Sequence, residues 1–200
     1  MTTKVYVEGG GYNPDTIKRC KQGFAEYCKK LSPPNRRPAI VACGSRQDAF
    51  ERFKIAVDNG RAGERFALLV DSEGPVRHNL DPAAFLHICD RWDFAGLPTD
   101  YVFLMVQAME AWFLADRTTL AAYYEDGFRP NNLPYDEHRI EEIPKDDLEP
   151  CLISASVGTK TKGSYHNTRH AFALLAEIDP AKVGAGSPHA AAFYEFLRSL

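Results

Sequence analysis

The chain lacks the long apolar stretches and cysteine patterns that would place it in a membrane or outside the cell. None of its apolar runs approaches the roughly 20 residues that cross a bilayer, and no signal-like stretch precedes the first predicted strand. The 5 cysteines are odd in number and form no CxxC pair, so we expect buried thiols rather than a disulfide framework or a zinc knuckle. These absences predict a cytoplasmic protein without a membrane partner.

Motifs of several common enzyme classes are also missing. The sequence has no HExxH, no GxSxG and no Cys–His arrangement, which disfavours zinc proteases and serine or thiol hydrolases. The glycines at 9–11 lack the Lys and Ser or Thr of a Walker loop, which disfavours ATP binding of that type. The formal net charge of −3 excludes a uniformly basic surface for nucleic acid but permits a local basic groove.

In the first half of the chain, short apolar runs alternate with segments whose apolar residues repeat at helical spacing. Strands are predicted at 4–8, 38–43, 66–70 and 101–106, and helices begin at the caps Asn13, Ser45 and Asp81. A strand–helix–strand order favours a parallel sheet with right-handed crossovers. We therefore predict an α/β fold with a mainly parallel, Rossmann-like sheet of about four strands flanked by helices.

The composition changes after Gly127. Residues 129–147 are rich in Pro, Asn and acids and are predicted to form a long loop, with helices over about 165–177 and from Ser187 onwards. No linker separates the two parts. We therefore predict an α/β core over residues 1–126 and a helical C-terminal extension over 127–200 that packs on the core as one structural unit.

Three carboxylates follow two of the predicted strands. Glu8 stands at the end of KVYVE, and Asp71 and Glu73 stand at the end of RFALLVDSE. Residues two apart in an extended chain point to the same side, so Asp71 and Glu73 are expected to face one ion with Ser72 turned away. If the two strands are neighbours, three acids meet at one edge of the sheet and require a cation, Mg²⁺ or Mn²⁺. All three are therefore predicted metal ligands and catalytic residues.

A structural explanation competes with this functional one. Glu8 also suits a tight turn in which its side chain is solvated, and DSEGP consists of good turn residues. The apolar FALLV before Asp71 favours function, because it fixes the acidic pair at the tip of a core strand. Gly9 and Gly10 are predicted to bind phosphate, since glycine lets the backbone approach a ligand closely.

Glu110 is a fourth candidate metal ligand. It follows the strand at 101–106 and lies near the start of a predicted helix, where a negative charge is also favoured without any ligand. Asp116 is six residues further on and points in a different direction from a regular helix, so the two acids are not expected to share an ion.

The segment KTKGSYHNTRH is the basic cluster best suited to phosphate. Lys162 is a predicted catalytic residue that offsets developing negative charge, and Arg169 is expected on the same helical face as Tyr165 and His166. The competing interpretation is a solvated basic helix start. The predicted phosphate-binding residues of this segment are Lys160, Lys162, His166 and Arg169, with His170 beside them.

These motifs resemble a known family. VYVEGGG and LLVDSE within an α/β sheet resemble the Toprim fold of topoisomerases, primases and nucleases of the overcoming-lysogenization-defect class. More closely, the chain resembles a bacterial Toprim-like family catalogued as domain of unknown function 4276. That resemblance covers most of the chain and rests on VEGGG, LVDSE, MVQAMEAWFLAD, HAFALLAEIDPAKV and SPHAAAFYEFL.

The resemblance implies a divalent-metal site in which Glu8 matches the lone Toprim glutamate. Asp71 and Glu73 match its Asp-x-Asp pair, with Glu instead of Asp at the second position. It further implies a Mg²⁺-dependent nuclease acting on DNA or RNA, with an ATPase partner in a system resembling anti-phage defence. Two alternatives stay open: a non-catalytic binding or regulatory subunit of an ATPase complex, and a small-molecule phosphohydrolase.

Overall fold

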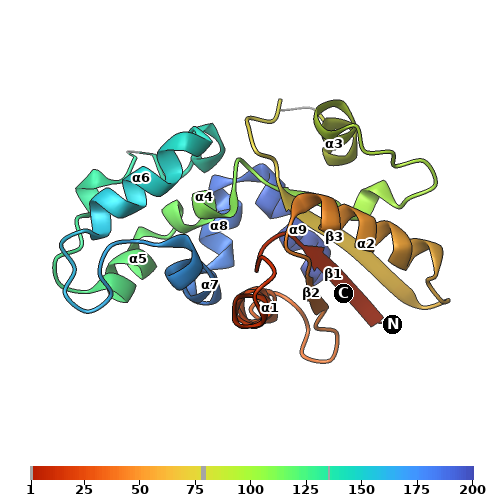
Figure 1. Ribbon diagram of the computed structural model, residues 1–200, viewed down its shortest axis with the longest axis horizontal. Helices are drawn as coiled ribbons and strands as arrows, with labels where there is room; N and C mark the ends of the chain where they lie inside the picture. The colour runs from red at the N-terminus through yellow and green to blue at the C-terminus, as the bar shows by residue number, and fades with distance from the viewer. Residues whose placement is uncertain (1, 78–79, 135) are drawn as a thin grey trace.

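A parallel sheet of four strands forms the centre of the α/β part of the molecule (Figure 1). The computed structural model describes residues 2–77, 80–134 and 136–200. The strands are β1 (Thr2–Val7), β2 (Ala39–Ala42), β3 (Glu64–Asp71) and β4 (Val102–Met105), in the order β2-β1-β3-β4 with every neighbouring pair parallel. This confirms the predicted fold class. It also makes β1 and β3, the two strands that end in acids, adjacent.

Helices connect the strands as the capping residues indicate. They are α1 (Pro14–Lys29), α2 (Arg46–Asp58) and α3 (Pro82–Asp90). Asn13 Oδ1 accepts the N–H of Asp15 at 2.8 Å. Ser45 and Asp48 form a reciprocal capping box at the start of α2. Asp81 Oδ1 accepts the N–H of Ala84 at 3.1 Å. Each cap satisfies backbone donors that a helix start leaves unpaired, and so fixes where the helix begins.

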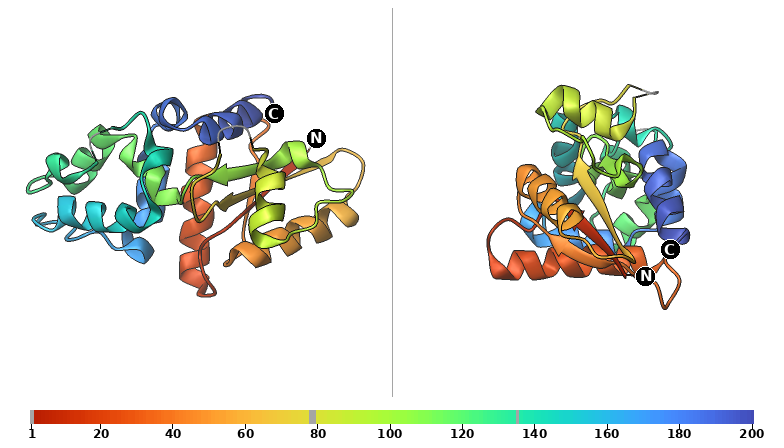
Figure 2. Two further views of the ribbon diagram at one scale, coloured as in Figure 1. Left: turned by 90° about the horizontal axis from the view of Figure 1, so that it is seen from above. Right: turned by 90° about the vertical axis from the view of Figure 1, so that its right-hand side faces the viewer.

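The sheet is covered on both faces. Val5 and Val7 of β1 belong to an apolar cluster that includes side chains of α1 and α9 (Pro188–Arg198). Tyr6 and Leu68 belong to a second cluster with α2 and α3, and Figure 2 shows these helices around the sheet. Since successive strand residues point to opposite faces, apolar residues at consecutive positions are what a sheet buried on both sides requires.

A helical layer lies beyond the carboxyl ends of the strands (Figure 2). It contains α4 (Met109–Leu114), α5 (Arg117–Tyr124), α6 (Lys145–Ser156) and α7 (Asn167–Glu177), with α8 (Pro180–Gly186) leading into α9. Short 3₁₀ turns occupy Thr99–Tyr101, Pro130–Asn132 and Ile140–Glu142. Among the described residues, none of the helices has both the length and the apolar character to traverse a membrane.

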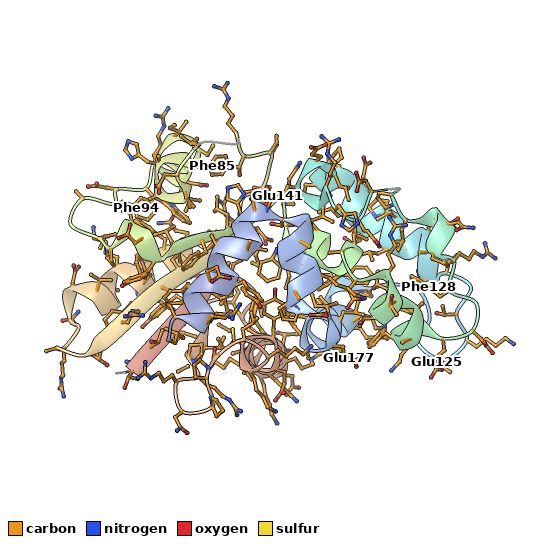
Figure 3. The ribbon with its side chains drawn as sticks, turned by 180° about the vertical axis from the view of Figure 1, so that it is seen from behind. Phe85, Phe94, Glu125, Phe128, Glu141 and Glu177 are labelled. Carbon is orange, nitrogen blue, oxygen red and sulfur yellow. The ribbon has the colours of Figure 1, made fainter. Side chains whose placement is uncertain are left out.

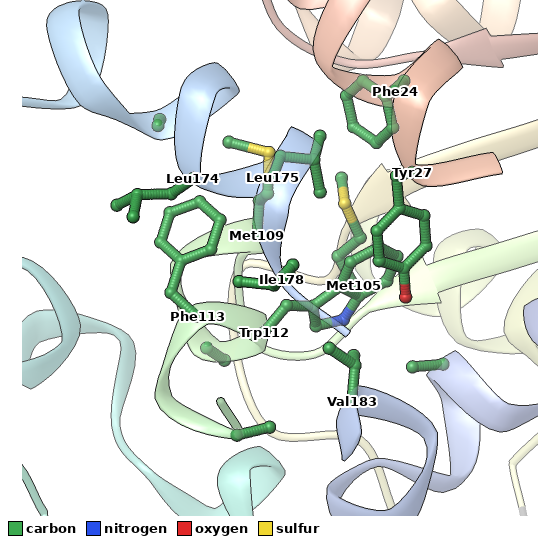
Figure 4. Close-up of a cluster of buried hydrophobic side chains, with 14 of the residues drawn as sticks. Phe24, Tyr27, Met105, Met109, Trp112, Phe113, Leu174, Leu175, Ile178 and Val183 are labelled. Atoms are coloured by element: carbon green, nitrogen blue, oxygen red, sulfur yellow. The ribbon is translucent and has the colours of Figure 1, made fainter. Parts of the chain in front are cut away.

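Trp112 of α4 lies fully buried where this layer meets the sheet (Figure 4). Its ring stacks on Tyr27 of α1 at 5.2 Å between centroids and on Phe193 of α9 at 6.5 Å.

Glu141 joins the 3₁₀ turn Ile140–Glu142 to the start of α9, as seen from behind in Figure 3. Its carboxylate accepts a hydrogen bond from the N–H of His189 at 3.0 Å and another from Ser187 Oγ.

Three expectations about the second half and the thiols were wrong. Residues 145–147 are not loop but the first turn of α6, which has no side-chain cap and contains Pro150, so the usual signals were absent. The helix α7 begins at Asn167, which leaves Tyr165 and His166 outside it and removes the predicted shared face with Arg169. The cysteines are unpaired, and Cys20, Cys28 and Cys43 are buried as expected, but Cys89 is exposed and Cys151 is half-buried.

Candidate metal centre

Glu8, Asp71 and Glu73 converge at the carboxyl ends of β1 and β3. One carboxylate oxygen from each lies within 4.8 Å of the others. The ends of neighbouring parallel strands meet at one sheet edge, where ligands of α/β proteins commonly bind. Three hard oxygen donors at this spacing fit the ligand preference of Mg²⁺ or Mn²⁺.

Backbone hydrogen bonds fix two of the acids. The N–H of Asp71 donates to Glu8 Oε2 at 3.1 Å, so the last residue of β3 orients the side chain that follows β1. The N–H of Met109 donates to Asp71 Oδ1 at 2.9 Å, which links the strand end to the start of α4. Arg46 contributes a further positive charge, with Nε 3.8 Å from Glu8 Oε2.

Glu73 reaches the group by a different route from the one expected. β3 ends at Asp71, and Glu73 has a left-handed φ of 64°, so the two acids do not face one ion through strand alternation. Ser72 between them is buried, and its hydroxyl donates to Gly74 O at 2.6 Å. The N–H of Glu73 donates to Gln107 O at 2.9 Å, and this bond holds the turn against the end of β4.

Burial and mutual repulsion raise the pKa values of the two inner acids. Desolvation is the largest cause for Glu8, whose pKa is raised to about 7, although the hydrogen bond from Asp71 and the Arg46 charge act in the opposite direction. Desolvation, followed by the charges of Glu8 and Glu110, raises the pKa of Asp71 well above its ordinary value. Without a cation, the charged forms of Glu8 and Asp71 are therefore unfavourable.

A cavity of about 260 Å³ opens above Glu8 and Asp71, and Glu73 lies outside its lining. Glu8 and Asp71 line it together with the loop Gly9–Gly11 from β1 and with Met109 and Phe172 from the helical layer. Gly9 and Gly10 have φ values of 118° and 84°, which glycine adopts readily, so the predicted glycine loop does border the acids. The N–H of Gly9, however, donates to Gly44 O at 2.9 Å and is not directed at the cavity.

Glu110 lines the same cavity but is not in the group of three. Its Oε1 accepts hydrogen bonds from Tyr165 Oη at 3.0 Å and from Asn167 Nδ2 at 2.9 Å. Burial raises the pKa of Glu110. Asp116 faces elsewhere, as expected, because it caps α5 through Thr119.

The predicted basic cluster lies largely outside the cavity. Lys162 Nζ is 4.6 Å from the centroid of the Tyr123 ring, and Lys160 and His166 are exposed. His170 is buried and accepts the N–H of His166 at 3.0 Å. The residues of this segment that do line the cavity are Asn167 and Thr168.

Sequence reasoning missed two cations near the acids. Lys145, the first residue of α6, forms an ion pair with Glu73 across 72 positions of sequence. Arg46, the first residue of α2, makes a two-pronged ion pair with Asp90 at 2.8 and 3.0 Å besides its contact with Glu8. The position of Arg46 directly after the Ser45 cap was a usable signal for a side chain at the sheet edge.

A family model matches residues 7–198, which is nearly the whole chain. The chain belongs to the family described as Domain of unknown function (DUF4276). No curated protein and no solved structure matches it. The residues that line the acidic cavity, from Glu8 to Phe172, all fall within the matched range, so the cavity is part of the DUF4276 domain.

Proposed function

We propose that this DUF4276 protein is a metal-dependent nuclease that hydrolyses phosphodiester bonds of DNA or RNA with Mg²⁺ or Mn²⁺. The observation that carries the proposal is the convergence of Glu8, Asp71 and Glu73 within 4.8 Å at adjacent strand ends. Raised pKa values for Glu8 and Asp71 support it, because a divalent cation removes the repulsion that disfavours their charged forms. The resemblance to Toprim nucleases gives the same assignment.

Each acid has a distinct role in this proposal. Asp71 and Glu73 hold the cation, which supplies Lewis acidity toward the scissile phosphate and the attacking water. Glu8, one of whose carboxylate oxygens lies within 4.8 Å of theirs, accepts a proton from the attacking water as general base. Gly10 and Gly11 border the cavity, and Glu110 holds Asn167, which also lines it, through a hydrogen bond.

A small phosphoester is the second candidate substrate. The cavity of about 260 Å³ is near the lower end of the volume range of small-molecule sites, and the predicted lysines do not line it. A substrate of this kind would bind the cation and contact the glycine loop, Asn167 and Thr168. A screen of nucleotides and phosphomonoesters alongside DNA and RNA separates the two candidates.

The decisive experiment compares Asp71→Asn with Glu64→Gln. Both substitutions remove one carboxylate from β3, but Glu64 lies at the opposite end of the strand and pairs with Lys4 at 3.1 Å. We expect Asp71→Asn to reduce Mn²⁺-dependent hydrolysis at least about 100-fold and to weaken Mn²⁺ binding in calorimetry, because it removes a ligand charge. Glu64→Gln should retain both.

Two results would contradict the proposal. Equal rates of hydrolysis by Asp71→Asn and the wild-type protein would show that Asp71 takes no part in the reaction. Tight Mn²⁺ binding without hydrolysis of any phosphoester instead supports the non-catalytic alternative, a binding or regulatory subunit that works with a partner such as an ATPase.

A further inference from the structure

A second cavity lies directly beside the acidic one, between α1 and α7. It measures about 240 Å³ and shares Thr168 and Phe172 with the acidic cavity. Arg19 and Gln22 line it from α1, and Arg169 lines it from α7. We call it the arginine groove.

The groove continues the acidic cavity along α1. Thr16 lines the acidic cavity and Arg19 lines the groove, and residues three apart lie on the same helical face, about 4.5 Å from each other along the helix axis. At Gly23 the two helices touch, because a Cβ atom there would lie 2.6 Å from Phe172 O. The two cavities therefore adjoin, with Glu8 and Asp71 lining one and Arg19 and Arg169 lining the other.

Both arginines are available to a ligand. Their side chains are exposed, and within residues 2–77, 80–134 and 136–200 neither guanidinium has an ion-pair or hydrogen-bond partner. By contrast, Arg46, beside the acids, is paired with Asp90. A guanidinium presents a planar set of donors that matches two oxygens of a phosphate. Two such groups on facing helices suit a substrate with a phosphate beyond the reacting one.

We infer that the arginine groove binds the backbone of a single nucleic-acid strand next to the phosphate that is hydrolysed. The inference rests on the proposed function and specifies its substrate as a polynucleotide rather than a phosphomonoester. In this arrangement Arg19 and Arg169 hold a neighbouring phosphate, while the acids and their cation engage the scissile one. The positive groove offsets the repulsion between the strand and an acidic cavity in a protein of net charge −3.

The test measures strand binding without divalent metal, so that no hydrolysis occurs. A fluorescein-labelled 12-nucleotide single-stranded DNA, and in a second arm the RNA of the same sequence, is titrated in EDTA and followed by anisotropy. The double variant Arg19→Gln/Arg169→Gln is compared with Arg61→Gln/Arg198→Gln. The control loses the same charge at positions outside the groove. Thermal unfolding of each variant establishes that it is folded.

We expect the groove variant to bind the strand about 10-fold more weakly or worse at 100 mM salt, and the control to bind like wild type. The slope of log K against log salt should fall by about 0.7, since the two arginines contact one phosphate and each lost phosphate contact on a single strand contributes about 0.7. Equal binding by the groove variant and wild type overturns the inference, as does a wild-type protein that binds neither strand.

A failure of the groove inference can be told apart from a failure of the proposed nuclease function. Asp71→Asn should bind the strand in EDTA at least as tightly as wild type, because it removes a carboxylate from the acidic cavity and leaves both arginines of the groove in place. Loss of hydrolysis in that variant together with unchanged binding in the groove variant refutes the groove alone. Strand binding that depends on the arginines in a protein with no hydrolytic activity refutes the nuclease alone.

Discussion

Glu8 and Asp71 are carboxyl groups that the fold holds next to each other and largely out of water. The N–H of Asp71 donates to Glu8, and the N–H of Met109 donates to Asp71, so neither side chain can swing away from the other without losing a hydrogen bond. Such an arrangement is unfavourable when both groups are charged and becomes favourable when a cation joins them. Residue-scale predictions therefore concern charge.

In the metal-free protein, we expect the contribution of Glu8 to the free energy of unfolding to fall as pH rises from about 4.5 to about 7. The folded pKa of Glu8 is raised, so over this range the folded state keeps a proton that the unfolded state has released. The loss amounts to about 1.4 kcal/mol for each unit of pKa difference. Urea unfolding in EDTA across this range, with Glu8→Gln as the comparison, measures it. Parallel pH profiles for the two proteins would show that Glu8 is not the cause.

Lys145 supplies a second prediction because it pairs with Glu73 where a cation is proposed to bind. Removing its charge by Lys145→Gln frees Glu73 and removes repulsion against an incoming cation. We expect Mn²⁺ to bind about two- to fivefold more tightly, a small effect because exposed ion pairs contribute only about 0–1 kcal/mol. Lys162→Gln, whose amine lies over Tyr123, is the matched control in calorimetry. Weaker binding in Lys145→Gln would mean that Lys145 supports the site rather than competing for it.

At the scale of elements, the capped helices and apolar strands follow from local sequence. Asn13, Ser45, Asp81 and Ser187 all cap helices in the way their side chains predict. The helix α6 does not follow from local sequence, because Pro144 offers no side-chain cap and Pro150 interrupts the helical pattern of residues. Its acidic first turn was the signal available, since acids are favoured at helix N-termini.

The contacts of the candidate site also divide into those that follow from local sequence and those that do not. Strand ends are local features, so the convergence of Glu8 with Asp71 and Glu73 was predictable once β1 and β3 were taken as neighbours. The pairing of Lys145 with Glu73 and of Asn167 with Glu110 was not. The first pair joins the helical layer to the turn after β3, and the second joins two helices of that layer, so their geometry depends on how the layer packs rather than on any short sequence pattern.

The close contact of α1 with α7 yields a prediction at this scale. Gly23→Ala should destabilise the protein by about 1–2 kcal/mol, because the added Cβ would meet Phe172 O at 2.6 Å and overpacking outweighs the gain in helix propensity. Gly184→Ala, in α8, is the control. There the nearest atom would be 3.7 Å away, and we expect a stabilisation of about 0.5–1 kcal/mol. Urea unfolding measures both. Stabilisation by Gly23→Ala would show that the helices can separate at little cost.

At the scale of the whole molecule, the sheet separates two apolar clusters, and each cluster contains one of the two tryptophans. Trp112 lies in the cluster with α1 and α9, and Trp92 lies in the cluster with α2 and α3. Alternate residues of β1 and β3 contribute to both clusters, so unfolding of one face exposes the other. The two tryptophans are therefore natural reporters of whether the faces unfold together.

We expect a single cooperative transition. In a Trp92→Phe protein, the fluorescence of Trp112 reports on one face, and Phe53→Ala removes a fully buried ring from the opposite face. Large-to-small changes of this kind cost about 3–5 kcal/mol, so the urea midpoint reported by Trp112 should fall although Phe53 is not in its cluster. Far-UV circular dichroism of the same samples should give the same midpoint. An unchanged Trp112 midpoint would mean that the α1 and α9 face folds independently of the other, and the acids of β1 and β3 would then depend on that face alone for their alignment.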